Sequence, residues 1–469
     1  MAGRRRPQVG ASEVPGRIGF GGHGAWRVER GPLGMLSPTA DRTAPLADAA
    51  RTLAGLAAAR ERTLALVEPI CDEDLERVHS RLMSPLVWDL GHISAFEDLW
   101  LVHRFGGEPM LRGDLAEVYD AFETPRAKRG DLPYLGCAEA HEYLAQVRRR
   151  VLELTDERGV NDGFVHEMVI RHEHQHQETM LQTVGLARLA DYRPAGIADP
   201  PSARPGGHTG LELVAVPGGP CHVGAGPEGF AYDNERPRRR VELPAFRIGR
   251  TPITNGTFLR FVEGGGYERR ELWSDEAWRW KEQYDITHPM NWTDDGREWR
   301  VGGYEPLDLD KPVIHVSWFE ADAFARAHDA RLPSELEWEK AATWDQERGA
   351  ARRHPWGDEP PAPHLATLDH AGLGPATAGA HPAGAAPSGC LGMVGDVWEW
   401  TSSCFRGYPG FRAHPYREYS EVFFGEGYRV LRGGSWATAS RVAAPTFRNW
   451  DYPERRQIFA GLRLARDGA

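Results

Sequence analysis

Three histidines have the types and spacing needed to bind one metal ion. His172 and His176, in the segment RHEHQHQETM, are four residues apart, so on a helix they lie one above the other on the same face. A third, His92, lies among mainly apolar residues in WDLGHISAFEDLW. Facing helices of a bundle commonly build such sites. Three neutral imidazoles without a carboxylate ligand leave coordination positions open, which favours a catalytic site over a structural one.

Each of these signals also has an ordinary explanation. A single histidine such as His92 is commonly a hydrogen-bonded core residue, and a solvated helix face also collects His, Glu and Gln. His174 lies about 200° around the helix from His172, so we expect it to be solvated and outside the site. Imidazole binds Zn, Cu, Fe and Ni alike, so the ligands alone do not choose the metal.

Helical periodicity predicts the elements that would carry these histidines. Apolar residues recur at helical spacing in four stretches, which predict a four-helix bundle: 46–67, 84–105, 138–155 and 161–190. The bundle is expected over residues 46–196. It is expected to follow a disordered leader at 1–45, which is rich in Arg, Gly and Pro.

A Pro- and Gly-rich linker at 197–210 predicts the boundary to a second domain at 211–469. That domain has short β-like pieces, many Gly, Pro and Trp residues, and helical patterns only near 318–330 and 334–343. We expect a loop-rich α+β domain. The stretch AGLGPATAGAHPAGAAPSG at 371–389 predicts a flexible surface insertion.

The composition argues against two classes of binding partner, nucleic acids and membranes. The net charge of −11 argues against nucleic acid. No apolar run approaches the roughly 20 residues that cross a bilayer, and the N-terminal segment has no apolar signal core, so a cytoplasmic protein with no membrane partner is expected. Five widely spread cysteines without a CxxC pair indicate neither a disulfide framework nor a thiolate zinc site.

Long motifs in the second half carry a family resemblance. They are TPITNGTFLRFVEGGGY (251–267), PVIHVSWFEADAFARAHDARLPSELEWEKAA (312–342), GDVWEWTSS (395–403) and VLRGGSWAT (430–438). This half resembles the formylglycine-generating-enzyme (sulfatase-modifying-factor) domain, which is related to the C-type lectin fold. The helical half resembles a DinB-type four-helix bundle. Their order, with HEHQHQE in the first half and RNWDYPERRQIFAGLR (448–463) in the second, resembles the ergothioneine-biosynthesis sulfoxide synthases (EgtB family) over about residues 45–466.

The resemblance implies an enzyme, a cofactor and substrates. In that family a non-haem Fe(II) held by three histidines uses O₂ to join a thiol sulfur to imidazole C2 of hercynine (Nα-trimethylhistidine), giving a sulfoxide. The matching ligands here are His92, His172 and His176. The expected partners are therefore small molecules: hercynine, O₂, and either γ-glutamylcysteine or cysteine.

Further residues match the family on the hercynine side. Gln175 matches a residue that contacts the imidazole, and Asn449 and Trp450 match residues near the trimethylammonium head and the carboxylate. A quaternary ammonium binds well to aromatic faces. Tyr416 and Tyr419 match a pair of tyrosines, the first of which supplies a proton or an electron during the oxygen chemistry.

On the thiol side, Arg126 and Arg129 match two arginines that hold the carboxylates of γ-glutamylcysteine. Asp451 matches an aspartate that faces the ammonium group of that substrate. Arginine geometry suits carboxylate recognition, so this combination favours the subgroup that uses γ-glutamylcysteine over the one that uses cysteine.

Alternatives remain open. The stretch FAGLRLARD lacks the cysteines that bind copper in formylglycine-generating enzymes, which argues against that activity. Selenoneine- or ovothiol-type enzymes share the scaffold. A DinB-type metal-dependent thiol transferase would not explain NWDYP and the two tyrosines. A non-catalytic, lectin-like binding module would not explain the three histidines.

Overall fold

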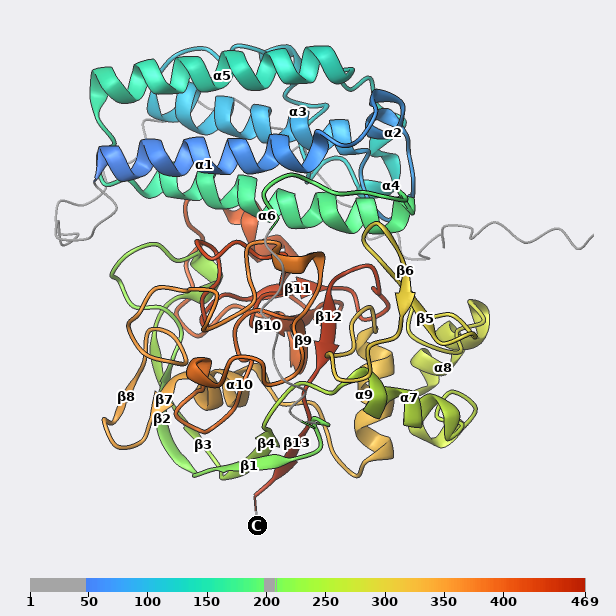
Figure 1. Cartoon of the computed structure of the whole chain (residues 1–469). Coiled ribbons are helices and arrows are strands. Elements are labelled where there is room, and N and C mark those ends of the chain that lie inside the picture. The colour runs from blue at the N-terminus through green and yellow to red at the C-terminus, as the bar shows by residue number, and fades with distance from the viewer. Residues whose placement is uncertain (1–47, 198–206, 208, 469) are drawn as a thin grey trace, which may run out of the picture. The chain divides into compact units, whose positions relative to one another are not determined.

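Residues 48–197, 207 and 209–468 are described by the computed structural model (Figure 1). They divide into two units, a helical unit that runs to Ala187 without Glu61–Leu66, and a second unit that takes Glu61–Leu66 and the chain from Arg188 onward. The predicted leader at 1–45 lies outside the described residues, and so does most of the predicted linker at 197–210.

The helical unit is the predicted bundle, and its long helices lie side by side in Figure 1. Short helices α2 (Asp72–Glu76) and α4 (Arg126–Arg129) stand in the connections. The predicted helical stretches are confirmed with small changes at their ends, since the four long helices are α1 (Ala49–Val67), α3 (Leu86–Glu97), α5 (Cys137–Arg158) and α6 (Phe164–Ala187).

Helix α3 is the central element of the bundle, because every one of its residues is buried. Its sequence, LVWDLGHISAFE, is apolar around most of its circumference, as expected for a helix that is covered on all sides. It packs against both α5 and α6 and continues directly into a π-helix over Asp98–Phe105. A residue on α3 is therefore held rigidly inside the unit.

Three buried charges and the half-buried Arg148 join the four long helices. Arg60 on α1 donates to Glu97 on α3 at 2.7 Å and to Glu173 on α6 at 2.8 Å. Arg148 on α5 donates to the same two carboxylates, at 2.6 and 3.1 Å. Two acids and two bases balance one another, and removing one partner of such a buried set typically costs about 3–5 kcal/mol. This network fixes how the helices face one another.

The second unit is the predicted α+β, loop-rich domain. One sheet has the order β11-β10-β9-β12, in which β12 runs parallel to β9, and a second has the order β1-β4-β13. Hairpins pair β2 with β3, β5 with β6 and β7 with β8. The strands are β1 (Leu213–Val216), β2 (Gly219–Val223), β3 (Arg239–Leu243), β4 (Phe246–Gly249), β5 (Arg297–Arg300), β6 (Gly303–Pro306), β7 (Trp344–Asp345), β8 (Ala350–Ala351), β9 (Trp398–Cys404), β10 (Arg429–Arg432), β11 (Asn449–Asp451), β12 (Ala460–Leu462) and β13 (Ala465–Asp467).

Two of the four longer helices of this unit were predicted, α9 (Trp318–Ala327) and α10 (Glu335–Thr343). The prediction missed α7 (Asn255–Glu263) and α8 (Asp275–Gln283). Each has only nine residues, too few to show a clear period, and each begins at a side-chain cap. Thr254 and Ser274 accept hydrogen bonds from the backbone N–H three residues on, which stabilises a helix start.

Residues from the long motifs of this half lie in its interior. Glu399, in GDVWEWTSS on β9, accepts hydrogen bonds from Trp338 Nε1 at 2.7 Å and from the Arg463 guanidinium. Arg432, in VLRGGSWAT, pairs with Glu339 at 2.6 Å. These side chains are almost completely buried. The motifs that carry the resemblance thus serve the packing of the domain.

The expectation of a flexible insertion at 371–389 is wrong. Ala376 and Ala378 are buried, and their backbone N–H groups donate to Asp396 Oδ1 and to the Asp310 carbonyl, each at 2.9 Å. His381 is 3% exposed and bonds to Thr367 Oγ1. Small residues and glycines here allow close packing of irregular backbone instead of mobility. Separately, we find no helix among the described residues with the length and apolar character needed to span a bilayer.

Candidate metal centre

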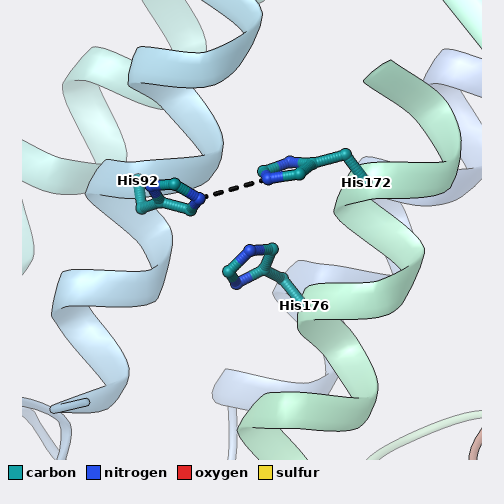
Figure 2. Close-up of side chains that lie close together, drawn as sticks. All are labelled: His92, His172 and His176. Carbon is teal, nitrogen blue, oxygen red and sulfur yellow. Dashed lines mark hydrogen bonds between the residues drawn. The ribbon is translucent and has the colours of Figure 1, made fainter. Parts of the chain in front are cut away.

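The structure brings the three predicted histidines together. Figure 2 shows His172 and His176 extending from α6 toward His92 on the facing helix α3. One nitrogen from each ring lies within 4.8 Å of the other two. The Nε2 atoms of His92 and His172 are 3.1 Å apart. Residues separated by 80 positions in the chain therefore form one compact cluster of nitrogen donors.

Hydrogen bonds at Nδ1 define which nitrogens face the cluster. His92 Nδ1 lies 2.7 Å from the Tyr119 carbonyl, and His176 Nδ1 lies 3.0 Å from Asp89 Oδ1. A carbonyl or carboxylate oxygen only accepts, so in each neutral ring Nδ1 carries the proton and Nε2 carries the lone pair. This arrangement, in which an outer partner orients two of the three rings, is typical of metal-binding histidines.

Burial lowers the pKa of two of the three rings, His92 and His172. The pKa of His92 lies well below its ordinary value, first because of burial and then because of the nearby His176. The pKa of His172 is lowered well below its ordinary value by the same two causes and by His92. Metal binding requires the unprotonated imidazole, so the donor set fits a divalent transition metal.

Aromatic rings enclose the cluster. The Trp88 ring stacks on His92 with centroids 4.9 Å apart, and the Phe96 ring stacks on His172 at 3.6 Å. Both aromatic residues belong to α3, one turn before and one turn after His92. They restrict the rotation of the two imidazoles and limit solvent access, two properties that preorganise a metal site.

Two other residues of α6, Gln175 and His174, lie next to the candidate ligands in the sequence. Gln175, expected to contact the imidazole of hercynine, is half-buried on α6 between the two histidines. His174 was expected to be solvated, and this is wrong, because it is 6% exposed and bonds to Gln177 Oε1 at 3.0 Å. The helix is covered on more than one side, which periodicity alone did not reveal. His174 remains outside the three-histidine cluster.

The two arginines expected to bind thiol carboxylates have different surroundings. Arg126 is half-buried, with Nη1 3.8 Å from Met83 Sδ. Arg129 is 6% exposed and its guanidinium carbon lies 4.0 Å from the centroid of the Trp88 ring. Its guanidinium donates to three protein oxygens at 2.9–3.0 Å, the Thr124 carbonyl, Ser84 Oγ and the Ala121 carbonyl. Much of the Arg129 donor capacity is therefore used inside the bundle.

In the second unit, Tyr419 lies near Trp450, and Tyr416 lies near Tyr419. The ring centroids of Tyr416 and Tyr419 are 6.2 Å apart, and those of Tyr419 and Trp450 are 6.1 Å apart. Tyr232 stacks on Tyr419 at 4.3 Å, while the Phe405 ring stacks on Trp450 at 4.1 Å. The tyrosines belong to a short segment whose 3-10 turn, Arg417–Tyr419, lies directly after Tyr416.

Strand β11 carries the other predicted residues of this unit. Asn449, Trp450 and Asp451 are each half-buried, and β11 pairs antiparallel with β10. Alternation along a strand places Asn449 and Asp451 on one face and Trp450 on the other. Asp451 lies 3.6 Å from Arg455 and accepts a hydrogen bond from the Tyr452 N–H.

The sequence analysis did not identify three residues that contact the predicted site residues: Asp89, Tyr119 and Tyr232. Asp89 lies three positions before His92 in WDLGH, a helical spacing that could have drawn attention to it. Tyr119 and Tyr232 had no local signal, because each meets its partner only through the tertiary fold.

Comparison with known proteins supports the division into two domain types. The DinB superfamily model matches residues 56–180, and that of the sulfatase-modifying factor enzyme 1-like domain matches residues 201–468. The class is therefore a DinB-type bundle with a histidine cluster, joined to a sulfatase-modifying-factor-like domain.

Three relatives match this chain along nearly their whole length. Each carries the name hercynine oxygenase and is 48% identical to this chain. The match spans 87% of this chain and 93% of the protein from Mycolicibacterium thermoresistibile. It spans 88% of this chain and 97% of the proteins from Mycolicibacterium smegmatis and Mycobacterium tuberculosis. The chain belongs to the hercynine oxygenase family.

Proposed function

We propose that this chain is an Fe(II)- and O₂-dependent sulfoxide synthase that joins the thiol of γ-glutamylcysteine to imidazole C2 of hercynine. The observation that carries the proposal is the three-histidine cluster, in which His92 is buried and His172 and His176 are half-buried, in a chain 48% identical to hercynine oxygenases. Its two Nδ1-anchored rings are preorganised to bind a metal. The same reading makes the protein an oxidoreductase of ergothioneine biosynthesis.

His92, His172 and His176 would hold the iron. Fe(II) with open coordination positions supplies the binding and activation of O₂. The residues around the cluster restrict the rotation of the imidazoles and limit the access of solvent, since Trp88 and Phe96 stack against two of the three rings. Gln175, half-buried between His172 and His176, is available to contact the substrate imidazole.

The proposed hercynine contacts in the second unit follow the family resemblance. Trp450 presents a half-buried aromatic ring, the kind of surface that binds a trimethylammonium group. Asn449 offers an amide for the carboxylate. Tyr416 is the proposed proton or electron donor, a role that suits a phenol within hydrogen-bond reach of the reacting group, with Tyr419 beside it.

The proposed contacts with the thiol substrate are made by charged side chains. Arg126, a half-buried guanidinium held by no carboxylate pairing among those found in the described residues, is suited to a substrate carboxylate. Asp451 is suited to the ammonium group of γ-glutamylcysteine. Arg129 is proposed to bind a carboxylate of the same substrate. Its hydrogen bonds within the bundle give it a structural role as well.

The deciding experiment is anaerobic reconstitution with Fe(II), followed by O₂ uptake and mass spectrometry of the product. Hercynine is supplied with either γ-glutamylcysteine or cysteine. We expect O₂ uptake that needs both substrates, a sulfoxide product, and a preference for γ-glutamylcysteine. Protein loaded with Zn(II) and the His172→Ala variant are the controls and should consume no O₂. Thiol transfer by the Zn(II) form without O₂ would instead support the transferase alternative.

A further inference from the structure

Asp89 is a buried carboxylate beside the histidine cluster and is not one of its three candidate ligands. It lies in the first turn of α3 with none of its surface exposed. Its Oδ1 is 3.0 Å from Nδ1 of His176 on α6, although the two residues are 87 positions apart in the chain. Its Oδ2 is buried and has no hydrogen-bond partner among the described residues.

A carboxylate in this setting is unfavourable unless something compensates its charge. Burying an oxygen without a hydrogen bond costs free energy, and burying a charge costs more. The Arg129 guanidinium is close enough to interact with Asp89 electrostatically, but it donates its hydrogen bonds to other oxygens. A divalent cation at the three histidines would provide the missing positive charge, since none of the three ligands is itself anionic.

We propose that Asp89 is a positioning residue for the metal site. It accepts the Nδ1 proton of His176, so the lone pair of that ring is held at Nε2, and its negative charge strengthens the binding of a cation. This role resembles the carboxylate–histidine pairs that orient ligands in other metalloproteins. The inference rests on the proposed metal site and adds to it a residue outside the ligand set.

The substitution Asp89→Asn tests the role with little change in shape. An asparagine carries no charge, and its amide NH₂ can turn toward Nδ1 of His176, which then favours the proton on Nε2 and removes the ligand lone pair. Both effects weaken metal binding. Losing an outer partner of a ligand typically lowers metal affinity about 10–100-fold.

The matched control is Asp98→Asn. Asp98 is also fully buried and follows α3 directly, but its partners are the N–H groups of Leu111 and Arg112 and the hydroxyl of Tyr143. None of these belongs to the histidine cluster. A merely structural need for a buried aspartate in this region would therefore affect both variants alike, whereas a positioning role affects only Asp89→Asn.

The measurement is Co(II) titration of chelator-treated protein, followed by visible absorption, with circular dichroism as the check of folding. We expect binding weakened about 10–100-fold in Asp89→Asn and unchanged in Asp98→Asn. Wild-type affinity in a folded Asp89→Asn variant would overturn the inference. Equal Co(II) affinity in wild type and His172→Ala would instead overturn the proposed metal site itself, so the two failures are distinguishable.

A second measurement needs no variant. Nitrogen-15 NMR of the histidine rings in chelator-treated wild-type protein reports which nitrogen of His176 carries the proton. We expect the proton on Nδ1, as the bond to Asp89 requires. A proton on Nε2 would contradict the proposed role, even if Asp89→Asn fails to fold.

Discussion

Arg129 places its guanidinium carbon 4.0 Å from the centroid of the Trp88 ring. That ring in turn stacks nearly parallel on His92, with 10° between the planes. A cation, an indole and a candidate metal ligand thus form one stack inside the bundle. A cation–π contact of this kind is worth about 2 kcal/mol when it is desolvated, so Arg129 stabilises the wall of the histidine cluster.

The two arginines are therefore expected to respond differently to mutation. Arg126→Ala should raise the KM for γ-glutamylcysteine about tenfold or more and leave the KM for hercynine and the Tm unchanged. Arg129→Ala removes a cation–π contact and leaves three oxygens without their donor, so it should also lower stability by about 2–4 kcal/mol. Thermal melting and steady-state kinetics with both substrates measure these effects.

Either of two outcomes would contradict this division. A normal Tm in Arg129→Ala, with only the KM for the thiol raised, would make Arg129 purely a substrate ligand. Equal increases in the KM for both substrates in Arg126→Ala would make that arginine structural.

We expect that replacing Gly91 lowers stability, because Tyr119 packs closely against this position. A Cβ atom at this position would lie 2.1 Å from Cζ of Tyr119, whose backbone carbonyl is hydrogen-bonded to His92 Nδ1. Gly91→Ala must therefore displace Tyr119, and overpacking of this kind typically destabilises a protein by about 1–3 kcal/mol. We expect a lower Tm and weaker Co(II) binding.

Gly185→Ala provides the control, because Gly185 is also on a bundle helix and its added Cβ would meet nothing within 4 Å. Alanine has the higher helix propensity, so this variant should gain up to about 1 kcal/mol. Equal behaviour of the two variants would show that the contact with Tyr119 does not constrain the site.

The role proposed for Tyr416 predicts a change in product. Tyr416→Phe keeps the ring and removes only the hydroxyl group. If the phenol supplies the proton or electron that favours coupling of sulfur to the imidazole, the variant should still consume O₂ but divert product from the sulfoxide to the sulfinic acid of the thiol. Mass spectrometry of wild type, Tyr416→Phe and Tyr419→Phe measures the partition. Diversion only in Tyr419→Phe would move the role to that residue, and diversion in neither would remove the tyrosine mechanism.

Asp233 gives a pH-dependent prediction for the segment that carries the tyrosines. It accepts hydrogen bonds from Ser420 Oγ and from the His414 N–H, and so it anchors this segment on both sides of Tyr416. Burial raises the pKa of Asp233 to about 6, with nearby Glu235 adding to the rise. The ordinary value in an unfolded chain is about 4.

Between about pH 4 and pH 6 the folded state therefore binds more protons than the unfolded state at this group. Stability from Asp233 is fully present below pH 4 and falls as pH rises to about 6, by about 3 kcal/mol in total. Asp233→Asn removes this slope. We expect the stability of wild type relative to Asp233→Asn to decrease by that amount from pH 4 to pH 7, measured by thermal melting. A pH-independent difference would show that Asp233 has an ordinary pKa in the fold.

Local sequence patterns were sufficient to predict the long helices, the histidine pair on α6 and the domain family of the second half. The long bundle helices and the His172–His176 pair depend on contacts within a few helical turns, and such contacts are visible as periodicity in the chain. The long motifs of the second half carried the resemblance to its domain family, which the comparisons confirm. Short helices such as α7 were missed, since nine residues show little period and their capping residues were not weighed.

Only the tertiary structure decided what surrounds the functional residues. Asp89 meets His176 across 87 positions and Tyr232 meets Tyr419 across the second unit, and no local pattern encodes such pairs. The same holds for burial, since His174 and the glycine-rich stretch at 371–389 have polar or small residues that suggest exposure and are nevertheless covered. A sequence shows which residues can share a helix face, whereas the packing of distant segments determines which of them lose water, pair and become positioned for chemistry.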